Sequence, residues 1–333
     1  MTNTEKLREI YSSELPDFLI KAAETDAMRR LKDVGMNCGC EYTSFPRFAG
    51  IEKYSRFDHS LGVALIVWSF THDKAQTLAG LFHDVSTPTF AHVIDFLRGD
   101  HLVQEATEAG TEDIIAASDD LQSILRESGL ETCDVSDYHR YPIADNNSPR
   151  LSADRLEYSL GNMLNYGIRS LDAAAGYYND LTLTENEDGE TEIAFTTLSA
   201  AAGFAEAALE CSKIYVSDED RYAMQALAEL VGSAVKDGVL TDEDLNGTEP
   251  ALIAKLKADS EYAKRWSGFC AMSEMAISER QYEDGAWRKI FAKKRCIDPL
   301  VAGLGRVSRL DAEFGARLHA FMNQTQDYWI KGI

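Results

Sequence analysis

The sequence predicts an all-α fold that contains one small β-hairpin and ends in a helical C-terminal extension. Only 7 prolines and 22 glycines occur among 333 residues, which suits a helical chain. Apolar residues recur at the spacing of one helix face through most of the chain. Apolar and polar residues alternate convincingly, as in strands, only over residues 180–196, where Glu-Asp-Gly supplies the turn.

The N-terminal part of the chain is predicted as helices separated by irregular segments. Residues 4–14 and 24–34 are expected to form short helices on either side of a Leu-Pro break. Residues 35–54 are rich in Gly, Pro and aromatic residues, so they are expected to be irregular. Residues 56–71 are apolar on most helix faces, and such a helix is buried.

The middle of the chain continues this pattern. Residues 74–84 predict a second apolar helix, and Pro88 supports its ending there. Residues 90–98 are expected to form a short helix and 101–128 a more polar helical stretch. Residues 131–149 look loop-like and close with Asp-Asn-Asn-Ser-Pro.

A further helix is predicted over residues 150–165, on which Asp154, Tyr158 and Gly161 share one face. Residues 197–333 are predicted as additional helices. The clearest of them are two Ala-rich stretches, 198–212 and 222–236.

Composition limits the classes of partner. The formal net charge of −22 makes binding to long nucleic acid electrostatically costly, although a small chelated anion can still enter a cleft. The N-terminus does not resemble a signal peptide, and no apolar run approaches the ~20 residues that span a bilayer. We therefore expect a cytoplasmic protein without membrane contact, whose six cysteines are reduced.

Four residues in three segments carry the strongest chemical signal. His59 lies in RFDHSLG, the adjacent pair His83-Asp84 in LFHDVSTP, and Asp154 in LSADRLEY. Imidazoles and carboxylates are good ligands for first-row metals. Two carboxylates buried together without a cation would be strongly unfavourable. The pattern favours an open metal site that activates water against phosphate esters, with a metal-free His-Asp hydrogen-bond network as the alternative.

These segments resemble the HD-domain metal-dependent phosphohydrolases. RFDHSLGVA, AGLFHDVSTPTFAH and SADRLEY are most similar to the deoxynucleoside triphosphate triphosphohydrolase branch, as is the approach FPRFAGIEKYSRFDHS. The resemblance is strong over residues 25–165 and faint afterwards. It implies an HD-type metal-binding helical core over residues 1–175. The hairpin and helical extension over 176–333 would pack on that core, either as a second unit or as part of one continuous domain.

The resemblance also implies a function. His59, His83, Asp84 and Asp154 would ligate one divalent ion (Mn, Fe, Ni, Mg or Zn). A metal-bound water would attack the phosphorus of a small phosphorylated metabolite, most simply a nucleotide. Asp84 would both ligate the ion and orient the water. Related enzymes commonly assemble, so the resemblance is compatible with a homo-oligomer.

Three further site residues are implied by the same resemblance. Arg56 would contact phosphate, a role that suits a permanently charged, forked donor; the alternative is a salt bridge at the helix start with Asp58 or Glu52. His92 would lie near the phosphates and share the catalytic stabilisation of charge, or instead support the site from behind. Tyr158 would line the sugar pocket, or serve only as a core tyrosine.

The chain departs from the family pattern at two positions. Thr87 stands where that branch usually has a histidine, and Gln104 stands where it has a catalytic histidine before Glu105. His101 could substitute only if the helix register differs. Loss of a proton-transfer residue typically costs ~10²–10⁴ in rate. The alternative function is therefore a catalytically weakened sensor or regulator that binds a nucleotide and a metal.

Two features are predicted to lie outside the site. The basic run Lys293-Lys294-Arg295 is interpreted as a solvated helix face, with a phosphate-binding role as the alternative. His139 has no obvious partners in the sequence and is expected to be structural.

Overall fold

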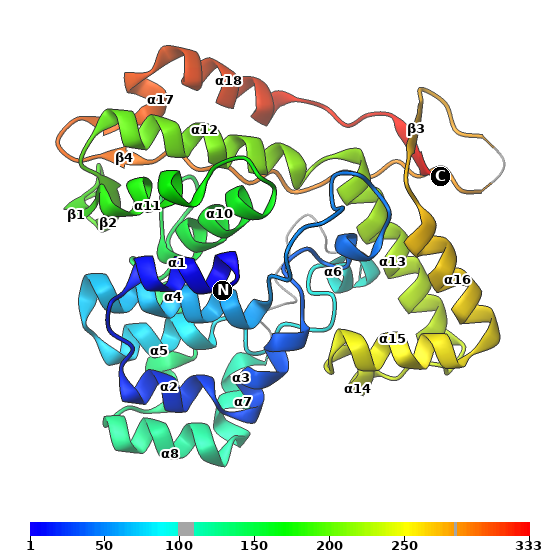
Figure 1. The fold of residues 1–333 in the computed structure, drawn as a ribbon, viewed down its shortest axis with the longest axis horizontal. Helices are drawn as coiled ribbons and strands as arrows, with labels where there is room; N and C mark the ends of the chain where they lie inside the picture. Colours follow the sequence, from blue (N-terminus) through cyan, green and yellow to red (C-terminus); the bar gives the residue numbers. More distant parts are fainter. Residues whose placement is uncertain (99–109, 283–284) are drawn as a thin grey trace.

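A computed structural model of the protein describes residues 1–98, 110–282 and 285–333 (Figure 1). Helices make up 57% of the described residues and strands 8%. The α-helices are α1 (Asn3–Tyr11), α2 (Asp17–Ala23), α3 (Asp26–Arg30), α4 (Arg56–Thr71), α5 (Lys74–Phe82), α6 (Val93–Arg98), α7 (Thr111–Ala117), α8 (Asp119–Ser128), α9 (Thr132–Val135), α10 (Ala153–Asn165), α11 (Leu171–Asn179), α12 (Leu198–Ile214), α13 (Asp218–Lys236), α14 (Asp242–Leu245), α15 (Glu249–Ala258), α16 (Ser260–Ala271), α17 (Val307–Leu310) and α18 (Ala312–Asn323). Short 3₁₀ turns cover Leu31–Asp33, Cys40–Tyr42 and Tyr138–Arg140.

Helix α4 is the central element of the N-terminal half. Its start is fixed by a capping box, in which the Ser55 hydroxyl accepts from the Asp58 amide and the Asp58 carboxylate accepts from the Ser55 amide. Eleven of its 16 residues are buried, as its apolar composition predicts. Helices α1, α5 and α10 pack around it. The start of α4, which carries His59, is therefore buried, and α1 and α5 lie on either side of the helix (Figure 1).

Most of the predicted helices are confirmed within a few residues. The helix over 56–71 matches α4, and 198–212 corresponds to α12. Within 101–128, two helices begin at Thr111 and Asp119; residues 101–109 lie outside the described part of the chain. The predicted loop 131–149 contains the short helix α9 and one 3₁₀ turn.

The strands require a correction to the all-α prediction, because the fold is mostly α with two small sheets. The predicted hairpin is confirmed as β1 (Leu181–Glu185) and β2 (Thr191–Phe195), with Gly189 at the turn in a left-handed conformation. The hairpin is extended by β4 (Leu300–Val301), parallel to β2, and by β5 (Gly305–Arg306). A second sheet pairs β3 (Met275–Ser278) with β6 (Trp329–Gly332).

These additional strands are too short to produce an alternating pattern. β4 and β5 have two residues each; β4 pairs with β2, which is remote in sequence, and β5 pairs with β4. Tertiary contacts, rather than local propensity, decide such strands. The expectation that residues 197–333 form helices was therefore wrong at these strands.

Two hydrophobic clusters form the interior. The larger contains apolar residues of α1, α4, α5, α10 and α12, together with the hairpin. The smaller contains residues of α6, α13, α15 and α16, and the segment around Phe45 and Phe48. A cavity of about 290 Å³ has walls drawn from both clusters, including Tyr138 of the larger and Met224 of the smaller. The division into 1–175 and 176–333 stays a proposal.

Two other expectations concern the whole chain. All six cysteines are free thiols. Among the described residues, none of the helices combines the length and apolar character that crossing a bilayer would require.

Candidate metal centre and its cavity

His59 is held on the first turn of α4 with a defined orientation. It is 1% exposed, and its Nδ1 lies 2.5 Å from Oε2 of Glu157. A carboxylate oxygen at that distance accepts a hydrogen bond. Nδ1 therefore carries the hydrogen and donates a hydrogen bond to Glu157. The other ring nitrogen, Nε2, therefore faces the centre of the site.

His83 reaches the same point from the C-terminal end of α5. Its Nδ1 lies 2.8 Å from the carbonyl oxygen of Gly80. Because a carbonyl can only accept, Nδ1 is the protonated nitrogen and Nε2 carries the lone pair. Asp154 comes from the first turn of α10, which starts where the Ser152 hydroxyl caps the Arg155 amide.

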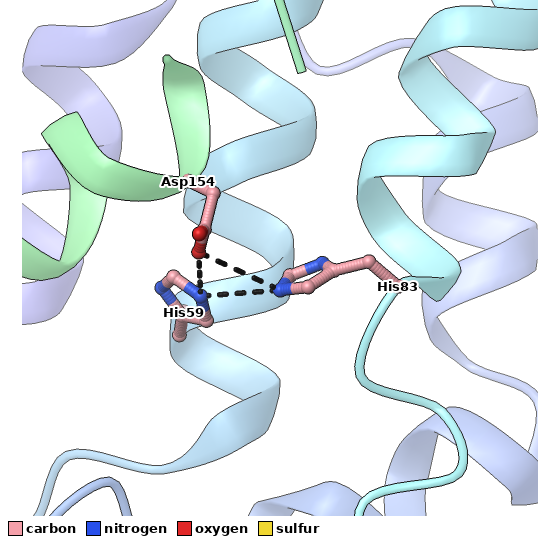
Figure 2. Close-up of side chains that lie close together, drawn as sticks. All are labelled: His59, His83 and Asp154. Carbon is pink, nitrogen blue, oxygen red and sulfur yellow. Dashed lines mark hydrogen bonds and ion pairs between the residues drawn. The ribbon is translucent and has the colours of Figure 1, made fainter. Parts of the chain in front are cut away.

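The three side chains converge on one small volume (Figure 2). Oδ1 of Asp154 lies 3.0 Å from Nε2 of His59 and 3.8 Å from Nε2 of His83, and the two imidazole nitrogens lie 3.2 Å apart. Ligands bound about 2.0–2.2 Å from one ion at tetrahedral or octahedral angles lie roughly 3.0–3.5 Å from their neighbours. The donor atoms therefore have a spacing close to that of a metal site.

The charges in this cluster also fit a cation. Both imidazoles direct a lone-pair nitrogen at each other and at a carboxylate, an arrangement that repels itself unless something positive lies between them. Burial disfavours a charged His59, but hydrogen bonds to Asp154 and Glu157 outweigh it and raise its pKa to about 10. Without a metal, a proton on Nε2 of His59 supplies the positive charge. With a metal, that proton would leave.

Asp84 lies beside this cluster and also accepts hydrogen bonds from Arg56 and Thr87. Its Oδ2 is 3.5 Å from Nε2 of His83 and 4.0 Å from Nε2 of His59. Nη1 of Arg56 donates to both of its oxygens at 2.9 and 3.2 Å, and the Thr87 hydroxyl donates to Oδ1 at 2.7 Å. Burial raises the carboxyl's pKa, but Arg56 and the two histidines outweigh that effect, so the pKa lies well below its usual range.

These contacts bear on two sequence alternatives. Arg56 pairs with Asp84, whereas Asp58 caps α4 and pairs with Arg8. The alternative interpretation, a salt bridge of Arg56 to Asp58 or Glu52, is not among the ion pairs of the described residues. Thr87 stands where the similar triphosphohydrolase branch usually has a histidine. Its hydroxyl donates to Asp84 and keeps that carboxylate oriented. Arg56 is therefore buried against the candidate centre.

Glu157 is a site residue that the sequence reasoning missed. It is 2% exposed, accepts from His59, and also accepts a short hydrogen bond from the Tyr54 hydroxyl. A Cβ at Gly62 would lie 2.6 Å from Glu157, and one at Gly161 would lie 2.6 Å from Tyr54. Two glycines thus make room for this pair. The sequence feature that could have identified Glu157 is its position three residues after Asp154, which places both on neighbouring parts of the same helix surface.

Cations from a distant segment also line the cavity. Lys293 and Arg295 are among the lining residues, together with Arg56 and Arg155. Lys294 is directed elsewhere, because its Nζ donates to the carbonyl oxygen of Met322. Residues 291–299 lie outside the helices and strands, and Lys293 and Arg295 face the cavity while Lys294 contacts Met322. The prediction that this basic run is a solvated helix face was therefore wrong.

His92 lines the cavity with both ring nitrogens engaged. Nδ1 lies 2.9 Å from Oδ2 of Asp95, and Nε2 accepts from Nη2 of Arg295 at 3.3 Å. Burial is the main cause that lowers the pKa of His92 to about 4, and the nearby Arg295 adds to it. The imidazole is therefore neutral at ordinary pH and orients Arg295 in the cavity.

Tyr158 belongs to a group of aromatic and amide side chains along the same cavity, which we call the aromatic wall. Its members are Asn37, Tyr158, Asn162, Tyr166 and Tyr215. The amide of Asn162 donates to the Tyr215 hydroxyl at 2.8 Å, and the Tyr166 hydroxyl donates to Oδ1 of Asn37 at 3.0 Å. Because α10 rises about 1.5 Å per residue, Asn162 lies about 12 Å along the helix from Asp154.

The remaining residues with a predicted or alternative role are accounted for as follows. His101, Gln104 and Glu105 lie outside the described residues. His139, interpreted from the sequence as structural, lines the cavity and contacts Asp145.

Comparisons with known proteins point in the same direction as the donor set. No protein-family model matches the chain. The uncharacterized protein YdhJ of Bacillus subtilis is 27% identical over 206 residues, which is 61% of this chain and 61% of YdhJ. The chain thus spans less than two thirds of that relative. A protein of Cordyceps militaris named metal-dependent phosphohydrolase cns2 is 25% identical over 257 residues, covering 71% of this chain and 68% of cns2.

The fold itself also occurs in a solved structure. A hypothetical protein from Aquifex aeolicus matches 96% of this chain and 93% of its own with a TM-score of 0.63. At 15% sequence identity, this likeness concerns the fold alone.

Proposed function

We propose that this protein is a metal-dependent phosphohydrolase of the HD type, acting on a small phosphorylated metabolite. The observation that carries the proposal is the convergence of two imidazole Nε2 lone pairs and the Asp154 carboxylate, with Asp84 alongside. Two histidines and two carboxylates leave positions open for water and substrate. A divalent ion bound there would polarise a phosphoryl oxygen and acidify a bound water. The distant relative named metal-dependent phosphohydrolase supports this interpretation.

The cations around the centre support a phosphate-bearing substrate. Arg56 and Arg295 both line the cavity, and each is held by a specific partner, Asp84 and His92 respectively. In a chain with a net charge of −22, these guanidinium groups place positive charge beside the candidate centre. They would bind phosphoryl oxygens and stabilise the charge that develops there during hydrolysis. In this arrangement, His92 contributes to catalysis by orienting Arg295.

The aromatic wall supports a nucleotide as the substrate. Phosphates at the metal would leave the rest of the molecule to extend along α10 past Tyr158 and Asn162. The stretch of about 12 Å matches the scale of a nucleoside, and the wall offers rings and amides that suit a sugar and a base. The similarity of SADRLEY to the triphosphohydrolase branch adds to this assignment. The substrate of the proposed enzyme is therefore a nucleotide.

A nucleotide panel tests this proposal. The purified protein would be incubated with nucleoside mono-, di- and triphosphates and with Mn²⁺, Mg²⁺, Fe²⁺ or Ni²⁺, while phosphate, pyrophosphate and triphosphate are measured. We expect metal-dependent release of one of these products and none from Asp154→Ala. If nucleotides bind and no product forms with any metal, the protein is a metal- and nucleotide-binding sensor instead.

A further inference from the structure

A buried acidic side chain lines the cavity beside the aromatic wall. Asp220 lies in the first turn of α13, and Met224, one turn later on the same helix, lines the cavity as well. Asp220 is 8% exposed, and its Oδ2 lies 3.8 Å from the thiol of Cys40, which is fully buried. Asp220 thus contacts a buried thiol on the protein side and borders the cavity on the other.

Most of the hydrogen-bonding capacity of this carboxyl group is unused. A thiol is a weak donor, whereas a carboxylate can accept about four hydrogen bonds. The nearby arginines are engaged with other acids, since Arg221 pairs with Asp218 and Arg47 with Glu219. Burial is the main cause that raises the pKa of the Asp220 carboxyl to about 8. At neutral pH the group therefore needs additional donors in order to carry its charge.

Asn37 offers a hydrogen-bond donor close to the same place. It is 8% exposed and lines the cavity. Its Oδ1 accepts from the Tyr166 hydroxyl, and among the described residues none accepts from its amide nitrogen. Burial raises the pKa of Tyr166 well above its usual value, and Asp220 is the charged neighbour that adds most to this shift. Tyr166 is therefore close to both residues, and the cavity has a donor and a pair of acceptor oxygens near each other.

One nucleobase has the edge that complements this pattern. Guanine presents side by side the O6 acceptor, the N1–H donor and the 2-amino donor. A carboxylate accepts from both donors as a pair, and an amide N–H group meets O6. Adenine has an amino group in place of O6, so it would meet the Asn37 amide donor to donor. Neither cytosine nor uracil presents two adjacent donors.

We propose that Asp220 is a specificity-determining residue that selects guanine nucleotides, accepting from N1–H and the 2-amino group while Asn37 donates to O6. This inference rests on the nucleotide substrate of the proposed function. Asp220 and Arg56 line the same cavity of about 290 Å³, so one nucleotide would contact both, with its base at the acid and its phosphate at the guanidinium. The proton of Asp220 passes to solvent when the two base donors take its place.

Binding of three nucleotides to the metal-free protein tests the proposal without hydrolysis. GMP and IMP are matched probes, because IMP lacks only the 2-amino group, and AMP is the third. We expect GMP to bind at least about tenfold more tightly than IMP, since it makes one more hydrogen bond to a charged group. AMP should also bind more weakly than GMP. Calorimetric titration in the presence of EDTA measures the three dissociation constants.

Two variants assign the preference to its residues. Asp220→Asn keeps the shape of the side chain but replaces one acceptor by a donor, so the preference for GMP over IMP should fall below about twofold. Asn37→Asp replaces the donor to O6 by an acceptor and should remove the preference for GMP over AMP. Asp242→Asn, which changes an exposed aspartate in the first turn of α14, is the matched control and should bind like the wild type. Circular dichroism checks that each variant is folded.

The outcomes separate this inference from the proposed function. Equal affinities of the wild type for GMP and IMP, or an unchanged preference in folded Asp220→Asn, would overturn the role of Asp220. A wild type that binds none of the three nucleotides would overturn the nucleotide substrate, and this inference with it. A wild type that prefers GMP through Asp220 but hydrolyses no nucleotide with any metal would support this inference and overturn only the proposed hydrolysis.

Discussion

At the start of α10, Asp154 belongs to a cluster in which every group is charged or holds a metal-directed lone pair. About one and two turns later, Tyr158 and Asn162 belong to the aromatic wall, whose groups are neutral. Burial raises the pKa of Tyr158 to about 12, so its hydroxyl stays protonated. One helix therefore presents a cation-binding surface and a neutral surface to the same cavity. This difference suggests how a substrate would lie: successive turns of α10 would bind its phosphate and its uncharged organic group.

The largest effect is expected from removing the carboxylate that the two histidines face. Asp154→Ala should weaken divalent metal binding by at least about 100-fold, because two lone-pair nitrogens cannot hold the ion as well without the anionic ligand. Elemental analysis after dialysis measures the retained metal. The control is Asp172→Ala, an exposed aspartate in the first turn of α11. If Asp154→Ala retained its full metal content, Asp154 would not be a metal ligand, and the proposed metal-binding surface of α10 would be contradicted.

The pH dependence of metal binding sharpens the same comparison. His59 has a pKa of about 10 in the metal-free protein, raised from 6.5, so a metal must displace its proton at any lower pH. The apparent dissociation constant should therefore rise about tenfold for each unit that pH falls from 9 to 7. Calorimetric titration with Mn²⁺ at several pH values measures it. A constant affinity over this range would contradict the assignment of His59.

The same shift predicts the stability of the metal-free protein. Because the folded-state pKa of His59 lies above its unfolded value, its contribution is fully present below pH 6.5 and is lost as pH rises towards 10. The free energy of unfolding of the metal-free form, measured by denaturant titration, should therefore contain a component that declines through this window.

A smaller effect on the metal cluster is expected from its support. Glu157→Gln removes the charge that fixes His59 through Nδ1 and should weaken metal binding about 10–100-fold. The fold should persist, because glutamine has nearly the same shape and can still accept from Tyr54. Circular dichroism checks folding and calorimetry checks affinity. Unchanged affinity in a folded variant would mean that the His59–Glu157 contact does not tune the site.

The smallest effect concerns the distant cations. Arg295→Met should raise KM for the phosphorylated substrate about tenfold and leave metal binding intact, since the guanidinium is held by His92 rather than by the metal cluster. Lys294→Met is the matched control, because its side chain is directed at Met322. Equal KM values for both variants would exclude Arg295 from phosphate binding.

The two surfaces also differ in how well the sequence predicted them. His59, His83, Asp84 and Asp154 lie in compact motifs on or next to predicted helices, so their convergence could be expected from the sequence, and their role as metal ligands stays a proposal. Arg295 and Asn37 lie far from those motifs in irregular segments, and only the tertiary fold brings them to the cavity. Glu157 was missed because its importance depends on which nitrogen of His59 it contacts.

The elements of the fold likewise divide into those that the sequence predicted and those that it did not. Helix α4 and the β1–β2 hairpin follow from local periodicity and turn residues. The strands β4 and β6 are short and pair with partners remote in sequence, so local patterns carry no signal for them.

A crystal structure of the protein soaked with Mn²⁺, with anomalous diffraction to locate the ion, tests the central claim most directly. We predict one ion between α4, α5 and α10, bound by Nε2 of His59 and Nε2 of His83. Carboxylate oxygens of Asp84 and Asp154 would complete the protein ligands at about 2.0–2.2 Å. An ion bound elsewhere, or a site that stays empty at saturating Mn²⁺ while His59 keeps its hydrogen bond to Asp154, would contradict the account.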